Sequence, residues 1–257
     1  MVDSTYHVRL FATDLEDTLL GEVAAARYFR EVWEALDPEQ RPLLVYNSGR
    51  SVQDIQWLVL ERRIPRAEFI IGGIGTEVHD PIDPNCSAEF HASIARDWDS
   101  AQVEAIVHEV PGVRLQPEEF LNPCKRSWFW PRASGGELAR LEARFQEAGL
   151  KVTVAYSDSV FLDVIPSDAG KGNALAWVCR RIGVQLADVL VAGAGANNCS
   201  MFALPGVRGV IVGNASSELF ASSSPFSPMI TRESNANGVL AALSHFGVVQ
   251  EIAQESR

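Results

Sequence analysis

The chain has 257 residues, of which 47% are hydrophobic, and this suffices for one large domain or for two unequal ones. Its 22 basic and 33 acidic residues give a formal net charge of −11, and no basic run reaches five residues. Both features argue against a nucleic-acid partner because a negative surface repels phosphate backbones. No apolar run approaches the ~20 residues that cross a bilayer, so no membrane partner is expected either.

The cysteines and the N-terminal residues favour a cytoplasmic protein. The first residues show neither the cationic start nor the apolar segment of a signal peptide. The cysteines form no CxxC pair and no zinc-binding spacing, and scattered thiols suit a reducing compartment. These cysteines are Cys86, Cys124, Cys179 and Cys199.

Along the first 80 residues, short apolar runs alternate with helical patterns, which is typical of an α/β sheet. Ser51 has the position of a helix N-cap. Gly72, Gly73 and Gly75 indicate a turn or a hinge rather than a phosphate-binding loop. Strands are expected at 8–13, 42–46, 68–71 and 76–79, and helices at 24–36 and 51–62.

A proline-containing stretch near residue 80 ends the alternation of strands and helices. From there to Pro166, helical patterns mix with alternating strands, which predicts an inserted α+β cap over residues 83–166. Helices are expected at 87–98, 101–110 and 136–148, and strands at 127–130, 152–156 and 160–165. Trp128 and Trp130 share one side of the first strand, where they fill the cap core or stack on a sugar, and the core is favoured. Hinges are expected near 80–85 and 157–166.

The alternation of strands and helices returns after Pro166. Helices are expected at 170–181, 197–202 and 238–246, and strands at 188–192 and 209–212. The prediction is therefore a doubly wound, Rossmann-type core made of residues 1–82 and 167–257, with residues 83–166 inserted as the cap.

Polar residues gather where the predicted core strands end, and ligands of such sheets bind at that edge. Asp14 is a candidate nucleophile that would form an acyl-phosphate, or else a turn residue. Ser48 would help to hold an anion, or only cap the next helix. Lys171 opposes the dipole at a helix start, which favours phosphate binding over a surface role. The loop 193–198 either wraps a ligand or forms a tight turn.

Together these segments resemble the sucrose-phosphate phosphatase group of the haloacid dehalogenase (HAD) superfamily, whose members carry a C2-type cap. The resemblance implies hydrolysis of a sugar-phosphate ester with Mg²⁺. It implies Asp14 as the nucleophile and Glu16 as the acid/base, where the family has Asp. The matching segments are 12–20, 46–51 (YNSGRS), 70–78, 125–130 (KRSWFW), 156–166, 170–177, 207–219 and 236–246.

The same resemblance assigns the binding residues. Phosphate contacts are implied for Ser48, Gly49, Lys171 and Asn197. A sugar-facing cleft is implied for Arg50, Glu77, Lys125 and Asp163.

The fourth motif departs from the family pattern. The family reads Gly-Asp-Ser-Gly-Asn-Asp, whereas this chain has Ala194 and Asn198 in place of the two acids. Only Asp14 and the backbone carbonyl of Glu16 would remain as protein ligands, so a weak Mg²⁺ site is expected. With two carboxylates facing Lys171, the pocket is closer to charge balance than a family member stripped of its metal. Loss of the metal should nevertheless cost several kcal/mol at the transition state.

Three functions follow as alternatives. The first is a slow sugar-phosphate phosphatase that uses Asp14 and Glu16. The second is a non-catalytic relative that binds a phosphosugar and regulates. The third is a metal-independent acid/base reaction on a sugar or glycoside, using the same two carboxylates. In each case the expected partner is a sugar or sugar phosphate, and the protein would be a monomer or dimer.

Overall fold

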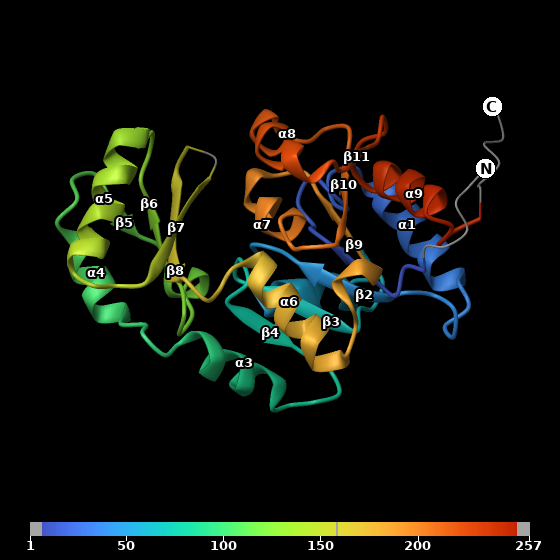
Figure 1. Cartoon of the computed structure of the whole chain (residues 1–257), viewed down its shortest axis with the longest axis horizontal. Helices are drawn as coiled ribbons and strands as arrows, with labels where there is room; N and C mark the ends of the chain where they lie inside the picture. The colour runs from blue at the N-terminus through green and yellow to red at the C-terminus, as the bar shows by residue number, and fades with distance from the viewer. Residues whose placement is uncertain (1–6, 158, 251–257) are drawn as a thin grey trace.

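In the computed structural model, which describes residues 7–157 and 159–250, a larger and a smaller sheet lie side by side (Figure 1). The larger sheet has the order β11-β10-β9-β1-β2-β3-β4 and is parallel except for β4. Its strands are β11 (Met229–Ile230), β10 (Arg208–Ile211), β9 (Val189–Gly193), β1 (Leu10–Thr13), β2 (Leu43–Asn47), β3 (Phe69–Gly72) and β4 (Glu77–His79).

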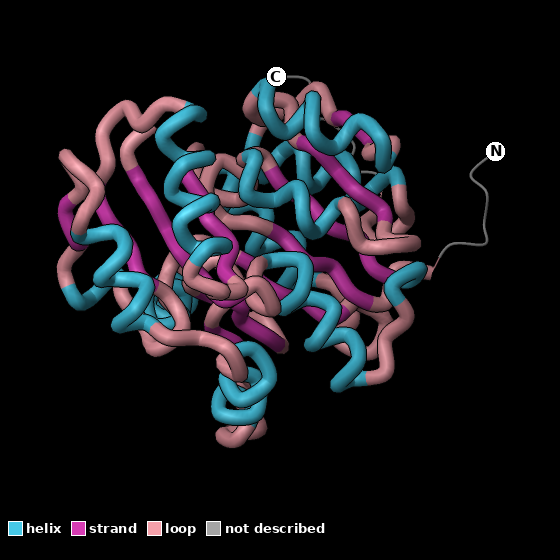
Figure 2. Tube along the Cα trace, turned by 60° about the vertical axis from the view of Figure 1, so that its left-hand side comes forward, coloured by secondary structure: helices cyan, strands magenta, loops and turns pink. Residues whose placement is uncertain are grey.

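Helices cover both faces of this sheet (Figure 2), which explains why its central strands are continuous apolar runs. Successive β1 residues serve opposite faces, since Phe11 packs into one apolar cluster and Leu10 and Ala12 into another. One face carries α1 (Val23–Ala35), α2 (Val52–Leu60) and α9 (Asn235–His245). The other carries α3 (Cys86–Ile94), α6 (Lys171–Ile182), α7 (Cys199–Phe202) and α8 (Ser217–Ser223).

The smaller sheet forms the inserted cap. It is antiparallel, with α4 (Ser100–His108) and α5 (Gly135–Glu147) on its outer face (Figure 1). Trp128 and Trp130 are each 4% exposed and pack against these helices, so the predicted core role is confirmed. The strands are β5 (Arg114–Leu115), β6 (Arg126–Phe129), β7 (Val152–Ser157) and β8 (Phe161–Pro166), in the order β5-β6-β8-β7.

The predicted α/β core with an α+β insertion is confirmed, and most predicted elements are present. Ser51 caps α2 by accepting a hydrogen bond from the Asp54 N–H. Among the strands and α-helices of the described residues, those that were not predicted are β5, β11 and α8. Both strands have only two residues, and α8 is serine-rich, so none of the three gives a clear periodic signal.

Helix α3 follows the predicted hinge in sequence, yet it packs on the core. Phe90 stacks edge-on against Trp177 of α6 at 5.2 Å between ring centroids. The Arg181 guanidinium on α6 pairs with Asp83 and Glu89. Whether the chain divides functionally at residue 83 stays a prediction.

Candidate active site

The carboxyl ends of three neighbouring parallel strands bring the predicted residues together. Thr13 at the end of β1 is in register with Tyr46 of β2 and with Ala192 of β9. The next residue on each strand therefore lies at the same edge, which places Asp14 between Asn47 and Gly193. The Asp14 N–H donates to the Ala192 carbonyl at 3.0 Å, which fixes the backbone at this point.

Asp14 and Lys171 form a buried ion pair. The Lys171 ammonium lies 2.9 Å from Asp14 Oδ2, and the two side chains are 0% and 4% exposed. Asp14 Oδ1 accepts the Leu15 N–H at 2.8 Å. The ammonium also donates to Asn198 Oδ1 at 3.2 Å. Of its three protons, these two contacts engage two.

Lys171 is positioned by a close backbone contact. It is the first residue of α6, and Gly170 before it has φ 107°. The Gly75 carbonyl, in the turn between β3 and β4, accepts the Gly170 N–H at 3.1 Å. A Cβ at Gly75 would lie 2.2 Å from the Gly170 carbonyl carbon, so only glycine permits this approach. The glycine turn predicted from sequence thus supports the start of α6.

Glu16 is held by two residues of the loop after β2. Ser48 Oγ donates to Glu16 Oε2 at 2.7 Å, and the Arg50 guanidinium pairs with Glu16 Oε1. Ser48 is fully buried, whereas the Glu16 and Arg50 side chains are 43% and 42% exposed. The hydroxyl expected to bind phosphate therefore donates to Glu16, and the arginine expected to face the sugar pairs with the same carboxylate. Gly49 leaves the backbone between them open, since an added Cβ would meet nothing closer than Ile74 at 3.9 Å.

The loop after β9 is organised by Asn198, which is fully buried. While its Oδ1 accepts from Lys171, its Nδ2 donates to the Gly195 carbonyl and to Asn197 Oδ1, both at 2.9 Å. Asn197 itself is exposed. Ala194 is 2% exposed and belongs to the apolar cluster under α1 and α9.

The cap contributes a second buried polar group. Lys125 Nζ lies 3.9 Å from Asp163 Oδ1, and Ser127 Oγ donates to the same oxygen. Burial raises the pKa of Asp163, although Lys125 and Ser127 both act to lower it. These residues project from the sheet face opposite to Trp128, as strand alternation requires. Phe129 and Phe161, which are only partly buried, lie on that face with ring centroids 6.0 Å apart.

A chain of contacts joins this cap group to the core site. Lys125 bridges to Asn122, and Asn122 Nδ2 donates to Thr76 Oγ1 at 2.8 Å. Thr76 ends the turn that contains Gly75, which in turn lies against Gly170. Glu77, the next residue, accepts the Val52 N–H at 3.1 Å and so stabilises the start of α2. This backbone contact explains the position of the Glu77 side chain without any contact to a sugar.

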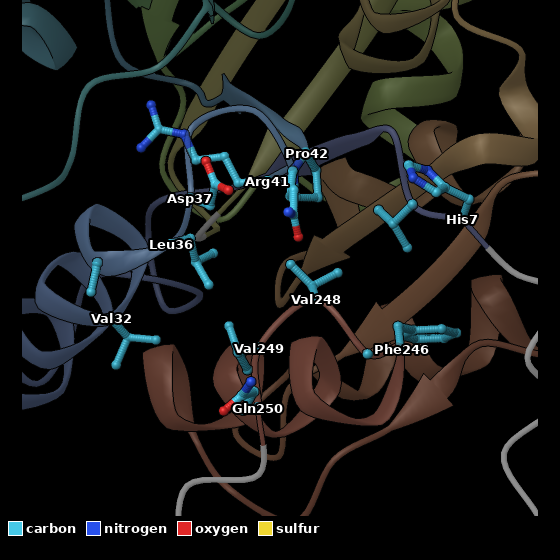
Figure 3. A pocket seen from close by; sticks show the side chains of 14 residues that line it. His7, Val32, Leu36, Asp37, Arg41, Pro42, Phe246, Val248, Val249 and Gln250 are labelled. Carbon is cyan, nitrogen blue, oxygen red and sulfur yellow. The ribbon is translucent and has the colours of Figure 1, made fainter.

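A cavity of about 670 Å³ lies elsewhere (Figure 3). Its lining includes Leu36 and Pro42, which precede β2, and Val8, which precedes β1. It therefore opens at the amino-terminal edge of the sheet, opposite to Asp14.

The comparisons with known proteins agree with this geometry. A model of the sucrose-6F-phosphate phosphohydrolase family matches residues 7–247. The chain belongs to this family. It is 35% identical over 244 residues to mannosylfructose-phosphate phosphatase of Agrobacterium fabrum, a match that covers 94% of this chain and 98% of the relative.

More distant members are similar over most of this chain. Sucrose-phosphatase 1 of Nicotiana tabacum is 29% identical over 252 residues, and the match spans 93% of this chain but only 59% of that relative. The crystal structure of the sucrose-phosphatase from Synechocystis, determined with sucrose and phosphate, superposes with a TM-score of 0.84 at 24% identity, covering 94% and 98% of the two chains. The fold is that of the HAD phosphatases.

The residues of this chain do not fit the Mg²⁺ that its resemblance to the family implies. Mg²⁺ requires near-octahedral oxygen ligands, including one or two carboxylates. Both Asp14 oxygens are engaged, Glu16 turns toward Arg50, and position 194 offers a methyl group. Among residues 7–157 and 159–250, no three His, Cys, Asp or Glu side chains gather closely enough to hold a metal.

Some residues of the site were not anticipated from sequence. Asn47 Nδ2 donates to the Lys171 carbonyl at 2.9 Å, and its buried Oδ1 has no hydrogen-bond partner. Ser127 supports Asp163, and the period of two that places Trp128 in the cap core already predicts Ser127 on the other face. Asn47 carried no comparable signal, because an Asn at a strand end is also a common turn residue.

Proposed function

We propose that this chain hydrolyses the phosphate ester of a disaccharide phosphate through Asp14. The observation that carries the proposal is the buried Asp14–Lys171 pair, 2.9 Å apart, at the edge of the sheet where Ser48 and Glu16 also lie. Such an edge is where parallel α/β sheets bind ligands. Family membership supports the same reaction, and it favours neither the non-catalytic nor the glycoside alternative.

In the proposed mechanism, an Asp14 oxygen attacks phosphorus and the ester oxygen leaves. Glu16 takes up a proton from solvent as it leaves Arg50 and gives this proton to the leaving oxygen, which yields the free sugar and an aspartyl-phosphate. Glu16 then accepts a proton from water, the resulting hydroxide attacks phosphorus, and Asp14 and inorganic phosphate are released. Lys171 stabilises the negative charge that the phosphoryl oxygens carry throughout.

Glu16 must change partners during this cycle. Its carboxylate accepts from Ser48 and Arg50 before substrate arrives, so both donors become available to phosphate when Glu16 turns toward the leaving oxygen. Arg50 is then a residue that positions Glu16 as well as a candidate ligand of the substrate. The longer Glu side chain allows this turn, but it also loosens the alignment on which proton transfer depends.

We assign sugar recognition to the cap. Lys125 and Asp163 provide hydrogen-bonding groups, and Phe129 and Phe161 present partly buried rings of the kind that cover sugars. A sugar phosphate as the bound small molecule is consistent with the Synechocystis relative, whose structure contains sucrose and phosphate.

We also propose a cytoplasmic location and a monomeric or dimeric state. The four cysteines are unpaired thiols, as expected in a reducing compartment. In the described part of the chain, no helix has the length and apolarity needed to span a membrane.

The test is phosphate release from sucrose 6-phosphate and from mannosylfructose phosphate. The wild type should release phosphate, Asp14→Asn should release none above background, and Glu16→Gln should be slower by roughly 10²–10⁴-fold. Glu39→Gln, at an exposed turn beyond α1, serves as the matched control and should retain full activity. Equal rates for Asp14→Asn and the wild type would refute Asp14 as the nucleophile.

A further inference from the structure

Four oppositely charged side chains form two ion pairs at this edge of the sheet, and their formal charges cancel. Asp14 pairs with Lys171 and Glu16 pairs with Arg50. Arg50 thus adds a cation that the sequence-based charge count had left out. A site with two further acids at positions 194 and 198 would instead carry two uncompensated negative charges, and without a metal it would repel phosphate.

The loop after β9 is built around an amide at position 198. Asn198 Oδ1 faces a donor, the Lys171 ammonium, while its Nδ2 faces two acceptors, the Gly195 carbonyl and Asn197 Oδ1. A carboxylate in the same place would put an oxygen where Nδ2 now donates to both acceptors. Those buried acceptors would then lose their donor, which is energetically costly. Asn198 is therefore integrated into the fold of its loop.

Ala194 is likewise accommodated as an apolar residue. Its methyl group lies in the cluster that α1 and α9 form with the sheet, and it is 2% exposed. The Ala194 carbonyl accepts the Ser216 N–H at 2.9 Å, so this backbone oxygen is also engaged. Both positions where the family pattern has an acid are thus occupied by residues that suit their present surroundings.

We infer that this site binds phosphate without a divalent cation, with the Lys171 ammonium neutralising the anion in place of Mg²⁺. The Lys171 ammonium has one proton beyond those that its contacts with Asp14 and Asn198 engage, and with Ala194 and Asn198 in place of acids the site lacks the repulsion that a metal would have to offset. This inference rests on the proposed function, because it takes phosphate as the ligand. It goes further in stating that catalysis and binding in this chain do not depend on added metal.

The experiment measures binding of inorganic phosphate calorimetrically, once with EDTA and once with MgCl₂. For the wild type the Kd should differ by less than about twofold between the two conditions, whereas Lys171→Met should lose binding in both. In Asn198→Asp and in the Ala194→Asp/Asn198→Asp double variant, Mg²⁺ should improve phosphate binding by about tenfold or more. Binding of Mn²⁺ alone, followed by electron paramagnetic resonance, should be absent in the wild type and gained in the double variant.

The outcomes separate this inference from the proposed function. Three results for the wild type would overturn the inference: phosphate binding that requires Mg²⁺, binding of Mn²⁺ alone, or no phosphate binding in either condition. Hydrolysis of a sugar phosphate that strictly requires Mg²⁺ overturns it while the proposed function stands. Equal phosphate binding in EDTA and Mg²⁺ without hydrolysis of either disaccharide phosphate upholds the inference and refutes the proposed function. Because the wild type carries the main comparison, a variant that fails to fold leaves the test intact.

Discussion

Replacing Lys171 by Met should destabilise the protein strongly, and for an electrostatic reason. Met has nearly the length and volume of Lys, so little cavity forms. The Asp14 carboxylate, 4% exposed, would lose its cation at 2.9 Å and keep only the Leu15 N–H. Removing one partner of a buried pair costs about 3–5 kcal/mol, which for a chain of this size lowers the Tm by roughly 6–20 °C.

A second substitution distinguishes this cause from simple loss of packing. Asp14→Asn combined with Lys171→Met leaves neither position of this pair charged, so it should recover at least half of the lost free energy of unfolding. Urea unfolding followed by tryptophan fluorescence measures both variants. The Lys151–Asp97 pair provides the control. Its Nζ and Oδ2 atoms lie 2.7 Å apart, but the two side chains are 71% and 59% exposed, so Lys151→Met should leave the urea midpoint unchanged. A loss under about 1 kcal/mol for Lys171→Met, or strictly additive effects of the two substitutions, would refute the reasoning.

Three further predictions test other parts of the structure. Arg50→Met should change the free energy of unfolding by less than about 1 kcal/mol, because its pair with Glu16 is half-exposed, yet it should lower kcat and shift the pH–rate profile; an unchanged profile would contradict its positioning role. Burial raises the pKa of Asp163, so the folded state holds this proton more tightly than the unfolded state, and the stability it contributes is present below about pH 4 and lost as pH rises. The free energy of unfolding of Asp163→Asn minus that of the wild type should therefore increase as pH rises from 4 to 7. A difference that does not change with pH would count against this. Cys199 should react with a thiol reagent before Cys179, which is buried and whose pKa burial raises to about 11; equal rates in the native protein would disprove the difference.

The fold was largely predictable because its strands and helices are long enough to show their periods. The runs that became β1 and β9 are buried on both faces, and they read as continuous apolar segments. Convergence of Asp14 and Ser48 could also be predicted, since parallel strands end at one edge, whereas Lys171 was expected there from its place at a helix start and from the family resemblance. The two-residue strand β5 could not, because pairing with β6 defines it and not its own residues.

The partners of the site residues were less accessible from sequence. That Ser48 donates to Glu16 depends on side-chain reach across two loops, which no spacing encodes. The predicted roles of Arg50 and Glu77 on the sugar side rested on resemblance, and the structure gives both residues partners within the core. Whether they also contact substrate stays a prediction.

The contact between Gly75 and Gly170 has a consequence for how this chain can evolve. A side chain at position 75 would act as a wedge between the hairpin and α6, and it would move the Lys171 backbone without touching a charged group. Inactivating changes in homologous chains are therefore to be sought in that hairpin as well as among the acids and the lysine. Conversely, an engineered insertion in the turn between β3 and β4 would displace the Lys171 ammonium from Asp14.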